Sequence, residues 1–473
     1  MLTENENINE LFNFNRSITK PVAIIGGGIA GLTAANFLKQ KNIPFILFEA
    51  GNKIAGLAMS FKDKDGFSND FGAHFITNRL AKAIGLEKEC KTVKYYGESV
   101  WINDKSYSYP FGLMAIPRMS FSFLKSGLKR NKNKTPPGSI AELFRTKYGE
   151  SLANEIALPL IEAWSGAPSE QLSAAIADSL PKSILKTIYL KIASKITGRA
   201  VGCGYNREKP ELPSVWHVYP NGGVARLCTK LAEDLDDSIR LQSPVKEIIV
   251  KNEKAVAVTV KDEQIDVSAV ISTAPANILS KMVNGTDAFE RIADFRFRPM
   301  LFVNMRFNKR NILPDTVLWL PEHQFPFFRL TEVTRSMPWL APEGKSIITA
   351  DIGCEKDDEF WNMDEEKLVT LCLKKMTAIF PHAETQFLKA TVLRTPYAYP
   401  IFLNEYEAER RQFENSTKIE NLLSIGRNGE FAHRFMEDIY WRTREKVESL
   451  IKKMSFNERN RFYSVSTANE LAK

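Results

Sequence analysis

The chain has 473 residues, of which 44% are hydrophobic and 25% are charged, and its formal net charge is +8. This composition is typical of a globular protein, and the length is enough for two or more domains with a large buried core. The basic residues are spread along the chain without a nucleic-acid-binding motif, so no nucleic-acid partner is expected.

Cysteine, histidine and the N-terminal segment limit the possible sites and locations. The five cysteines are odd in number and form no CxxC pair, which favours reduced thiols. His217, His323 and His382 lack the spacing of metal ligands, so no metal site is predicted. Residues 1–19 lack the basic start and apolar run of a signal peptide, and no segment is long and apolar enough to span a membrane. The sequence therefore predicts a cytoplasmic protein.

Residues 22–49 predict a dinucleotide-binding unit. An apolar strand leads into Gly26, Gly28 and Gly31, and a helix, a second strand and Glu49 follow. In such a unit the first glycine permits the tight turn, the second lets the backbone approach a pyrophosphate at the helix N-terminus, and the third lets helix and strand pack closely. A carboxylate at the position of Glu49 can accept both hydroxyls of an adenosine ribose. The motif alone leaves NAD and FAD open.

The next segments predict short strands followed by a helical lobe. Glycines punctuate strand-like pieces after residue 50, and helical spacing begins near 135, where Ser139 and Glu142 form a capping-box pattern. A later helix at 182–196 has six apolar residues on one face: Ile184, Leu185, Ile188, Tyr189, Ile192 and Ile196. Its lysines lie elsewhere, which fits either a solvated helix or a helix whose apolar face enters an anionic membrane surface.

The second half of the chain is richer in strands. Residues 216–235 predict a loop with paired glycines that leads into a helix, and residues 239–279 alternate like a strand meander. Residues 298–395 mix strands with a helix around 364–380.

The tail repeats the strand-to-helix pattern of residues 22–49. An apolar strand meets Gly426 and Arg427, and a helix is expected to begin near Glu437.

Taken in order, these segments resemble the flavoprotein superfamily that contains monoamine oxidases, protoporphyrinogen oxidases, phytoene desaturases and UDP-galactopyranose mutases. The resemblance covers nearly the whole chain. It rests on the unit at 22–49 and on these further segments: DFGAH at 70–74, the helical stretches at 142–152 and 158–173, YPNGGVARL at 219–227, SPVKEI at 243–248, VISTAP at 270–275 and GRNGEFAHRFMEDI at 426–439. Because members of this superfamily fold a second strand-to-helix junction back onto the cofactor, the resemblance implies FAD rather than NAD.

The resemblance also implies the fold class and the domains. It implies an α/β protein with a Rossmann-like FAD-binding domain of the GR2 type, a mixed-sheet substrate domain and a helical lobe at about 135–200. The expected FAD-binding domain is discontinuous and comprises residues 20–80, 214–280 and 396–455. The expected substrate domain comprises residues 81–213 and 281–395.

By this resemblance, each matching residue of the first half receives a role toward FAD. Gly26, Gly28 and Gly31 meet the pyrophosphate, and Glu49 meets the adenosine ribose. The backbone of Val245 meets the adenine.

The resemblance gives the tail the other end of the cofactor. Arg427 pairs with a phosphate through charge-assisted hydrogen bonds. Met436 presents its backbone N–H and the positive end of the last helix to the flavin O2, and Glu437 lies near the ribityl chain. The other residues expected along FAD are Ile29, Ala30, Ala50, Gly56, Leu57, Gly72, Ala73 and His74.

Two departures from the superfamily pattern stand out. Ala55, Gly56 and Leu57 occupy the place where relatives have Gly-Gly-Arg, so one customary contact to a phosphate or the ribityl chain is absent. The tail has a Gly-Arg form, as the mutases and some oxidase-like relatives do, instead of the longer amine-oxidase form. A non-redox function therefore stays open.

Three residues are candidates for a role in catalysis. His74 resembles a histidine beside the isoalloxazine, although it also fits a structural histidine in a tight turn. Tyr399 belongs to a stretch at 394–406 that resembles a wall of the substrate cavity, and an ordinary half-buried strand would look the same. Arg329 suits either an anionic substrate or a solvated surface.

The leading functional prediction is an FAD-dependent oxidase or desaturase that removes hydride from a C–N or C–C bond of a small, apolar or aromatic substrate. One alternative is a non-redox flavin enzyme like UDP-galactopyranose mutase, which acts on a nucleotide sugar. A second alternative is a non-catalytic binding protein with this fold. Peripheral membrane contact through residues 182–196 is an accompanying hypothesis, and the oligomeric state is left open.

Overall fold

The computed structural model describes residues 20–72, 74–129, 137–179, 184–204 and 207–471. The chain forms two compact units, each built from separated segments. The first unit comprises residues 1–57, 227–294 and 409–473, and the second comprises residues 58–226 and 295–408. The predicted division into a cofactor domain and a substrate domain stays a prediction, because these units are defined by compactness alone.

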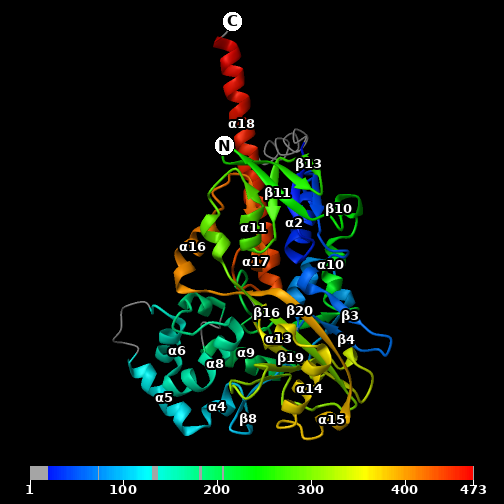
Figure 1. The fold of residues 1–473 in the computed structure, drawn as a ribbon, viewed down its shortest axis with the longest axis vertical. Coiled ribbons are helices and arrows are strands. Elements are labelled where there is room, and N and C mark those ends of the chain that lie inside the picture. Colours follow the sequence, from blue (N-terminus) through cyan, green and yellow to red (C-terminus); the bar gives the residue numbers. More distant parts are fainter. Residues whose placement is uncertain (1–19, 73, 130–136, 180–183, 205–206, 472–473) are drawn as a thin grey trace. The chain divides into compact units, whose positions relative to one another are not determined.

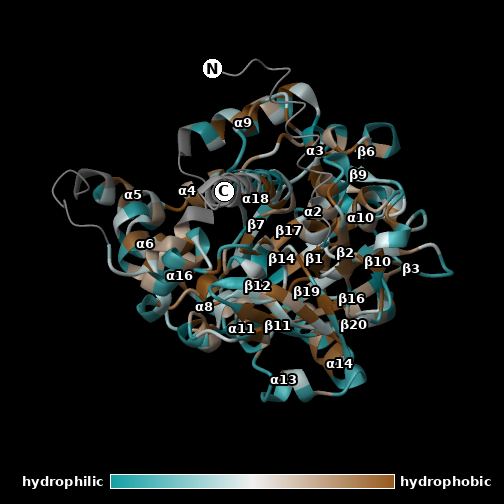
Figure 2. Cartoon of the chain, turned by 90° about the horizontal axis from the view of Figure 1, so that it is seen from above, coloured by the Kyte–Doolittle hydropathy of each residue, from teal (hydrophilic) through white to brown (hydrophobic). Residues whose placement is uncertain are grey.

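A five-stranded parallel sheet forms the centre of the first unit (Figure 1). Its strands, in spatial order, are β10 (Ile239–Arg240), β2 (Phe45–Phe48), β1 (Val22–Ile25), β14 (Ala269–Ser272) and β21 (Leu422–Ser424). β1 and β14 are buried along their whole length, as expected for parallel strands covered on both faces, and Figure 2 colours these strands as largely hydrophobic. The predicted order of strand, helix and strand over residues 22–49 is confirmed.

Two helices pack against each other in this unit. Helix α2 (Ile29–Gln40) joins β1 to β2, and helix α18 (Met436–Leu471) lies beside it (Figure 1). The guanidinium of Arg444 on α18 lies 4.7 Å from the centre of the Phe37 ring on α2. The helix predicted to begin near Glu437 is therefore present, and it packs on the helix that follows the first glycine turn.

The rest of the first unit is a second sheet with short helices. The predicted strand meander is confirmed as a sheet in the order β13 (Glu263–Asp266), β12 (Lys254–Val260), β11 (Val245–Lys251) and β15 (Val283–Asn284). The helices are α10 (Ala225–Leu231), α11 (Ala276–Met282), α16 (Glu407–Asn415) and α17 (Gly426–Gly429), of which α10 and α16 begin in the second unit.

A seven-stranded mixed sheet forms the centre of the second unit. Its strands, in spatial order, are β20 (Phe387–Pro400), β16 (Phe297–Phe307), β19 (Ser346–Gly353), β18 (Arg329–Glu332), β17 (Val317–Trp319), β7 (Glu98–Ile102) and β8 (Lys105–Ser108). β17 and β7 are parallel, whereas the other neighbours are antiparallel. All residues of β16 are buried, so this strand lies in the core of the unit. The mixed sheet agrees with the fold class predicted from the sequence.

Two small sheets complete the strands of the second unit. They are a hairpin of β3 (Ser60–Lys62) and β4 (Ser68–Asp70), and a three-stranded sheet in the order β5 (Ile76–Thr77), β9 (His217–Pro220) and β6 (Cys90–Thr92). Strand β9 corrects the prediction of a loop at this position. Residues 217–220 become a buried strand because they pair with β5 on one side and with β6 on the other.

The predicted helical lobe is present in the second unit. It contains α4 (Phe111–Met114), α5 (Pro117–Lys129), α6 (Ile140–Tyr148), α7 (Glu150–Leu152), a π-helical turn (Ala153–Ala157), α8 (Leu158–Ser165) and α9 (Ile184–Thr197). The Ser139 hydroxyl caps α6 by accepting a hydrogen bond of 3.3 Å from the Glu142 amide. The Glu142 carboxylate accepts from the Gly138 amide at 2.9 Å, so the predicted capping box closes one residue earlier than usual.

The remaining helices of the second unit are short or lie over the sheet. They are α3 (Asn78–Ala83), α12 (Val333–Ser336), α13 (Glu359–Asn362), α14 (Glu365–Met376) and α15 (Ala383–Gln386). α14 confirms the helix predicted around 364–380. No helix within the described ranges has both the length and the apolar character needed to cross a membrane.

Candidate functional site

The glycine turn between β1 and α2 leaves open space where a phosphate is expected. A methyl group on Gly31 would overlap the carbonyl oxygen of Gly26, so the helix packs directly on the turn. In contrast, no atom lies within 4 Å of the place where a Cβ of Gly28 would stand. Gly28 precedes the first turn of α2, whose amides have no intrahelical partner. This opening at a helix N-terminus fits an anionic group.

Glu49 is fixed beside the glycine turn by backbone amides. Its Oε2 accepts a hydrogen bond of 2.6 Å from the Gly27 amide, and its Oε1 accepts one of 2.7 Å from the Gly51 amide. Each carboxylate oxygen can accept a second bond, so the carboxylate keeps capacity for hydroxyl groups of a ligand.

Residues 55–57 lie against the same turn. Ala55 forms a parallel bridge with Gly28, and its amide donates to the Gly27 carbonyl at 2.9 Å. A Cβ on Gly56 would stand 3.7 Å from the Gly28 Cα. Ala55 adopts a φ of +99°, a conformation that normally favours glycine. The segment that departs from Gly-Gly-Arg therefore keeps a glycine-like backbone.

The C-terminal turn, residues Gly426–Gly429, contacts the first helix. A Cβ on Gly426 would stand 3.1 Å from the Cβ of Ala30, and α17 also packs on α2 and α18. The half-buried Arg427 donates from Nε to the Arg434 carbonyl at 3.2 Å. The two strand-to-helix junctions that the sequence singled out are thus brought together within the first unit.

A cluster of buried charges holds the C-terminal turn. Glu430 is 2% exposed and forms ion pairs with Arg434, Arg442 and Lys446 at 3.2, 2.5 and 3.4 Å. Glu414 pairs with Arg434, with Arg442 at 3.4 Å and with Arg410 at 3.0 Å. These cations hold the pKa of the Glu414 carboxyl below its usual range despite its burial. Sequence reasoning missed this cluster.

The other residues predicted for the first unit lie around these turns or at its strand ends. Met436 is the first residue of α18. Glu437 follows it, is buried, and accepts a hydrogen bond of 3.2 Å from the Trp441 indole. Val245 begins β11, and Ala50 is exposed directly after Glu49.

In the second unit, Asp70 anchors the segment that leads to His74. Asp70 is 5% exposed and accepts hydrogen bonds from the hydroxyls of Ser60 and Tyr219 and from the Val224 amide. Burial raises the pKa of Asp70 to about 7, although these hydrogen bonds act in the opposite direction. The NGG turn at 221–223 and the β3–β4 hairpin are therefore joined through one carboxyl group.

Gly72 and His74 lie beside a cluster of aromatic side chains. A Cβ on Gly72 would stand 3.4 Å from the Phe302 ring and 3.9 Å from the His74 imidazole. Tyr399 packs edge-on against Trp164, with 4.9 Å between ring centres, and belongs to the same apolar cluster as Phe302. Two of the three candidate catalytic residues are thus near one aromatic cluster. Ala73 lies outside the described residues.

The sequence model of flavin-containing amine oxidoreductases matches residues 29–437 of this chain. The chain belongs to this family. The coproporphyrinogen III oxidase of Staphylococcus aureus is 24% identical over 402 residues, which cover 76% of this chain and 84% of the relative. The superfamily predicted from the sequence is confirmed, and the family implies a flavin oxidoreductase.

Two solved structures share the fold of this amine oxidoreductase family member. Reduced UDP-galactopyranose mutase has a TM-score of 0.75 at 18% identity, covering 92% of this chain and 94% of that chain. A putrescine oxidase variant with redesigned cofactor binding has a TM-score of 0.64 at 14% identity, covering 92% of this chain and 99% of that chain. At these identities the similarity confirms the α/β fold class and goes no further.

Arg329 of this family member is committed to an ion pair. Its Nε donates to the buried Asp351 at 2.8 Å, and its guanidinium lies 5.4 Å from the centre of the Trp319 ring. Asp351 stands directly opposite Arg329 where β18 pairs with β19. Sequence reasoning missed Asp351, because only the strand register reveals the pair.

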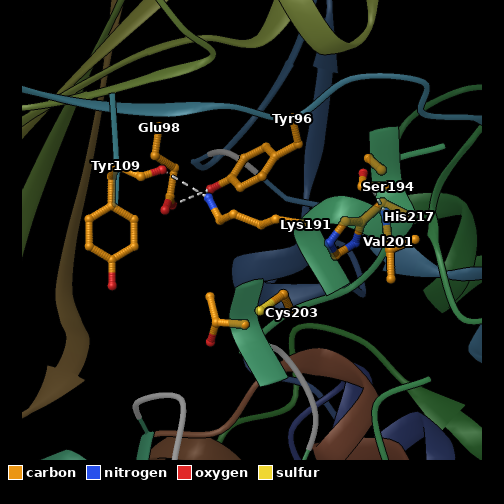
Figure 3. A pocket seen from close by; sticks show the side chains of 10 residues that line it. Tyr96, Glu98, Tyr109, Lys191, Ser194, Val201, Cys203 and His217 are labelled. Carbon is orange, nitrogen blue, oxygen red and sulfur yellow. Dashed lines mark hydrogen bonds between the residues drawn. The ribbon is translucent and has the colours of Figure 1, made fainter. Parts of the chain in front are cut away.

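A pocket that sequence reasoning did not find lies in the second unit (Figure 3). Its empty space is about 530 Å³ when the open solvent at its mouth is counted. Its lining comprises Tyr96, Glu98, Tyr109, Thr187, Lys191, Ser194, Ala200, Val201, Cys203 and His217. His217 has no metal-ligand spacing in the sequence, and the structure makes it part of the pocket wall.

Proposed function

We propose that the chain is an FAD-dependent oxidase or desaturase that removes hydride from a C–N or C–C bond of a small organic molecule. The observation that carries this proposal is the contact between the C-terminal turn, at Gly426, and the first helix, at Ala30. A single glycine turn serves NAD and FAD alike, whereas a second turn packed against the first suits the longer FAD site. The coproporphyrinogen III oxidase relative supports an oxidation over a non-redox reaction.

The residues of the first unit fit FAD in the way the resemblance implies. The open space at Gly28 would take the pyrophosphate, Glu49 the ribose, and Arg427 a phosphate. Met436 would present the N-terminal end of α18 to the isoalloxazine. A flavin supplies the hydride acceptor when bound, so the chain's own task is to bind and orient the substrate and to exclude water.

We assign the substrate-facing roles to the second unit. His74 is proposed at the flavin edge, and Tyr399 with Trp164 is proposed to form an aromatic wall for an apolar or aromatic substrate. Arg329 is proposed as a positioning residue that holds Trp319, because its charge is already paired with Asp351.

The flavin spectrum and its reoxidation test this function. Purified protein should have visible flavin absorbance, and anaerobic photoreduction followed by air should give rapid reoxidation with release of peroxide. Slow reoxidation together with turnover of UDP-galactopyranose would instead identify a mutase. Protein that neither carries nor takes up flavin would identify a non-catalytic binding protein.

We further propose that the enzyme is cytoplasmic and that it binds anionic membrane surfaces through α9. Tyr189, Ile192 and Ile196 are 58%, 49% and 80% exposed, so half of the predicted apolar face is turned to solvent. Lys186 and Lys195 are exposed on the same helix, which suits anionic headgroups. Lys182 lies outside the described residues, and nothing is described of the side chains of Ile184 and Leu185.

Vesicle sedimentation tests the membrane proposal. The protein should sediment with vesicles rich in phosphatidylglycerol, and the double substitution Ile192→Glu with Ile196→Glu should abolish this. The matched control is Leu388→Glu on β20, which changes another exposed apolar side chain, 44% exposed. Equal sedimentation of both variants would contradict the proposal.

A further inference from the structure

Lys191 presents a cation to the pocket of the second unit. Thr187, Lys191 and Ser194 stand at helical spacing on α9 and all line the pocket (Figure 3). The Lys191 ammonium donates to the Tyr109 carbonyl at 3.2 Å and lies 5.4 Å from the centre of the Tyr109 ring. An ammonium has three donors. Within the described part of the chain Lys191 forms no ion pair, so it keeps donors and an unneutralised charge for a ligand.

The pocket also has an aromatic part, formed by Tyr96 and His217 and backed by Phe75. The ring centre of Phe75 lies 5.2 Å from that of Tyr96 and 5.2 Å from that of His217, and the last two are 6.2 Å apart. Burial lowers the pKa of His217 to about 4, so its imidazole is neutral near pH 7. This aromatic part therefore offers flat, uncharged surface of the kind that small-molecule pockets use around a few polar groups.

Glu98 is the carboxylate of this pocket, and it already has a donor. The Tyr96 hydroxyl donates to Glu98 at 2.8 Å, as the dashed line in Figure 3 marks. Lys191, in contrast, contacts uncharged groups of Tyr109, namely its backbone carbonyl and its ring. An acidic ligand would form a charge-assisted bond with Lys191 without displacing a carboxylate, whereas a cationic ligand would have to compete with the Tyr96 hydroxyl for Glu98.

We infer that this pocket binds an aromatic carboxylic acid, with the ligand carboxylate at Lys191 and the ring against Tyr96 and His217. Phe75 directly follows His74, which is proposed at the flavin edge. The pocket would then bind the acidic end of the substrate. That the ligand is the substrate rests on the proposed function, whereas binding of an aromatic acid does not.

Binding of benzoate, with benzamide and benzylamine as probes of charge, tests this site. Calorimetry should detect benzoate binding to the wild-type protein and none of benzamide. Lys191→Met should weaken benzoate binding at least tenfold, and Lys191→Arg should retain most of it. The matched control is Lys195→Met, an exposed lysine one turn further on α9, which should bind as the wild type does.

Two results would overturn the inference. One is undiminished benzoate binding by Lys191→Met. The other is benzylamine binding that Glu98→Gln abolishes, which would make the pocket an ammonium site. Flavin absorbance of the same preparations reports separately on the proposed function, so an acid site without flavin would refute that function and leave this site intact.

Discussion

Two turns of this protein are held by buried carboxylates in opposite ways. The C-terminal turn of the first unit ends at Glu430, and the turn after β4 in the second unit begins at Asp70. Glu430 meets three cations, whereas Asp70 accepts hydrogen bonds from neutral donors only, as far as the described residues go. Glu430 thus lies in a cationic environment, whereas burial raises the pKa of the Asp70 carboxyl among its neutral donors.

Similar burial therefore does not give these two carboxyl groups the same chemistry. Both carboxyl groups are at most 5% exposed. We expect the turn at Glu430 to depend on its charge and the turn at Asp70 to depend on its proton. The following predictions separate the two.

The largest effect is expected from neutralising Glu430. Glu430→Gln leaves three buried or half-buried cations with one carboxylate fewer, and removing one partner of a buried ion pair costs about 3–5 kcal/mol. The free energy of unfolding, measured in urea, should fall by this amount. The matched control is Glu420→Gln, since Glu420 forms an exposed pair with Lys254 that should contribute less than about 1 kcal/mol. Equal losses of unfolding free energy in both variants would show that the Glu430 cluster stabilises the fold no more than an exposed ion pair does.

The next effect is a pH dependence at Asp70. Its pKa is about 7 in the folded protein and 3.8 in the reference state, so the folded state binds more protons between these values. The contribution of Asp70 to the free energy of unfolding is therefore lost as pH rises from about 4 to about 7. The loss is at most about 4 kcal/mol, because one pKa unit corresponds to about 1.4 kcal/mol. Asp70→Asn should remove this loss, which unfolding midpoints at pH 4.5 and 7.5 would measure.

His217 must be allowed for in that measurement. Its pKa falls from 6.5 to about 4 on burial, so it contributes stability that is lost as pH falls through this range. This trend opposes that of Asp70. The informative quantity is hence the difference between Asp70→Asn and wild type at each pH; a difference that does not change with pH would contradict the expectation.

The sequence predicted contacts within one continuous motif and missed contacts that tertiary packing and strand register create. The turn at Gly26 and the acid at Glu49 belong to one continuous motif, so spacing alone indicated their arrangement. The Glu430 cluster and the pair of Arg329 with Asp351 join residues whose partners are set by tertiary packing and strand register. From the sequence alone, the charged residues of these pairs cannot be distinguished from exposed surface residues.

The strand β9 was missed for a related reason. Residues 217–220 contain proline beside an NGG turn, which predicts a loop, yet pairing with β5 and β6 makes them a strand. The pocket lined by Lys191 and Tyr96 was missed because α9 and the start of β7 are far apart in the chain.

The glycine turn at 26–31 offers a third case, because close packing at Gly31 and open space at Gly28 act there together with the Glu49 carboxylate. Gly31→Ala would force a methyl group onto the Gly26 carbonyl and should cost about 1–3 kcal/mol of stability. Gly28→Ala has room for its methyl group and an ordinary φ of −80°, so the flavin-free protein should stay as stable as wild type. Flavin affinity of Gly28→Ala should still fall at least tenfold, since the methyl group enters the space proposed for the pyrophosphate.

These two variants separate folding from cofactor binding. In thermal unfolding of the flavin-free proteins, Gly31→Ala should be the less stable variant. In flavin titration, Gly28→Ala should be the weaker binder. Tight flavin binding by Gly28→Ala would contradict the proposed position of the pyrophosphate while leaving the fold unaffected.

The smallest effect is expected at Ala55, where opposing contributions nearly cancel. Ala55 holds a φ of +99°, where a Cβ is strained by about 1 kcal/mol or more, so Ala55→Gly should relieve this strain. Glycine also gains entropy in the unfolded chain, and the buried Ala55 loses the contacts of one methyl group, so the net change should stay below about 1 kcal/mol. The matched control is Ala35→Gly at a similarly buried position in the interior of α2, which should destabilise by more than about 1 kcal/mol because a methyl group is lost and no strain is relieved there. If Ala55→Gly destabilised as Ala35→Gly does, the bridge between Ala55 and Gly28 would rest on the alanine side chain and not on a backbone shape that glycine favours.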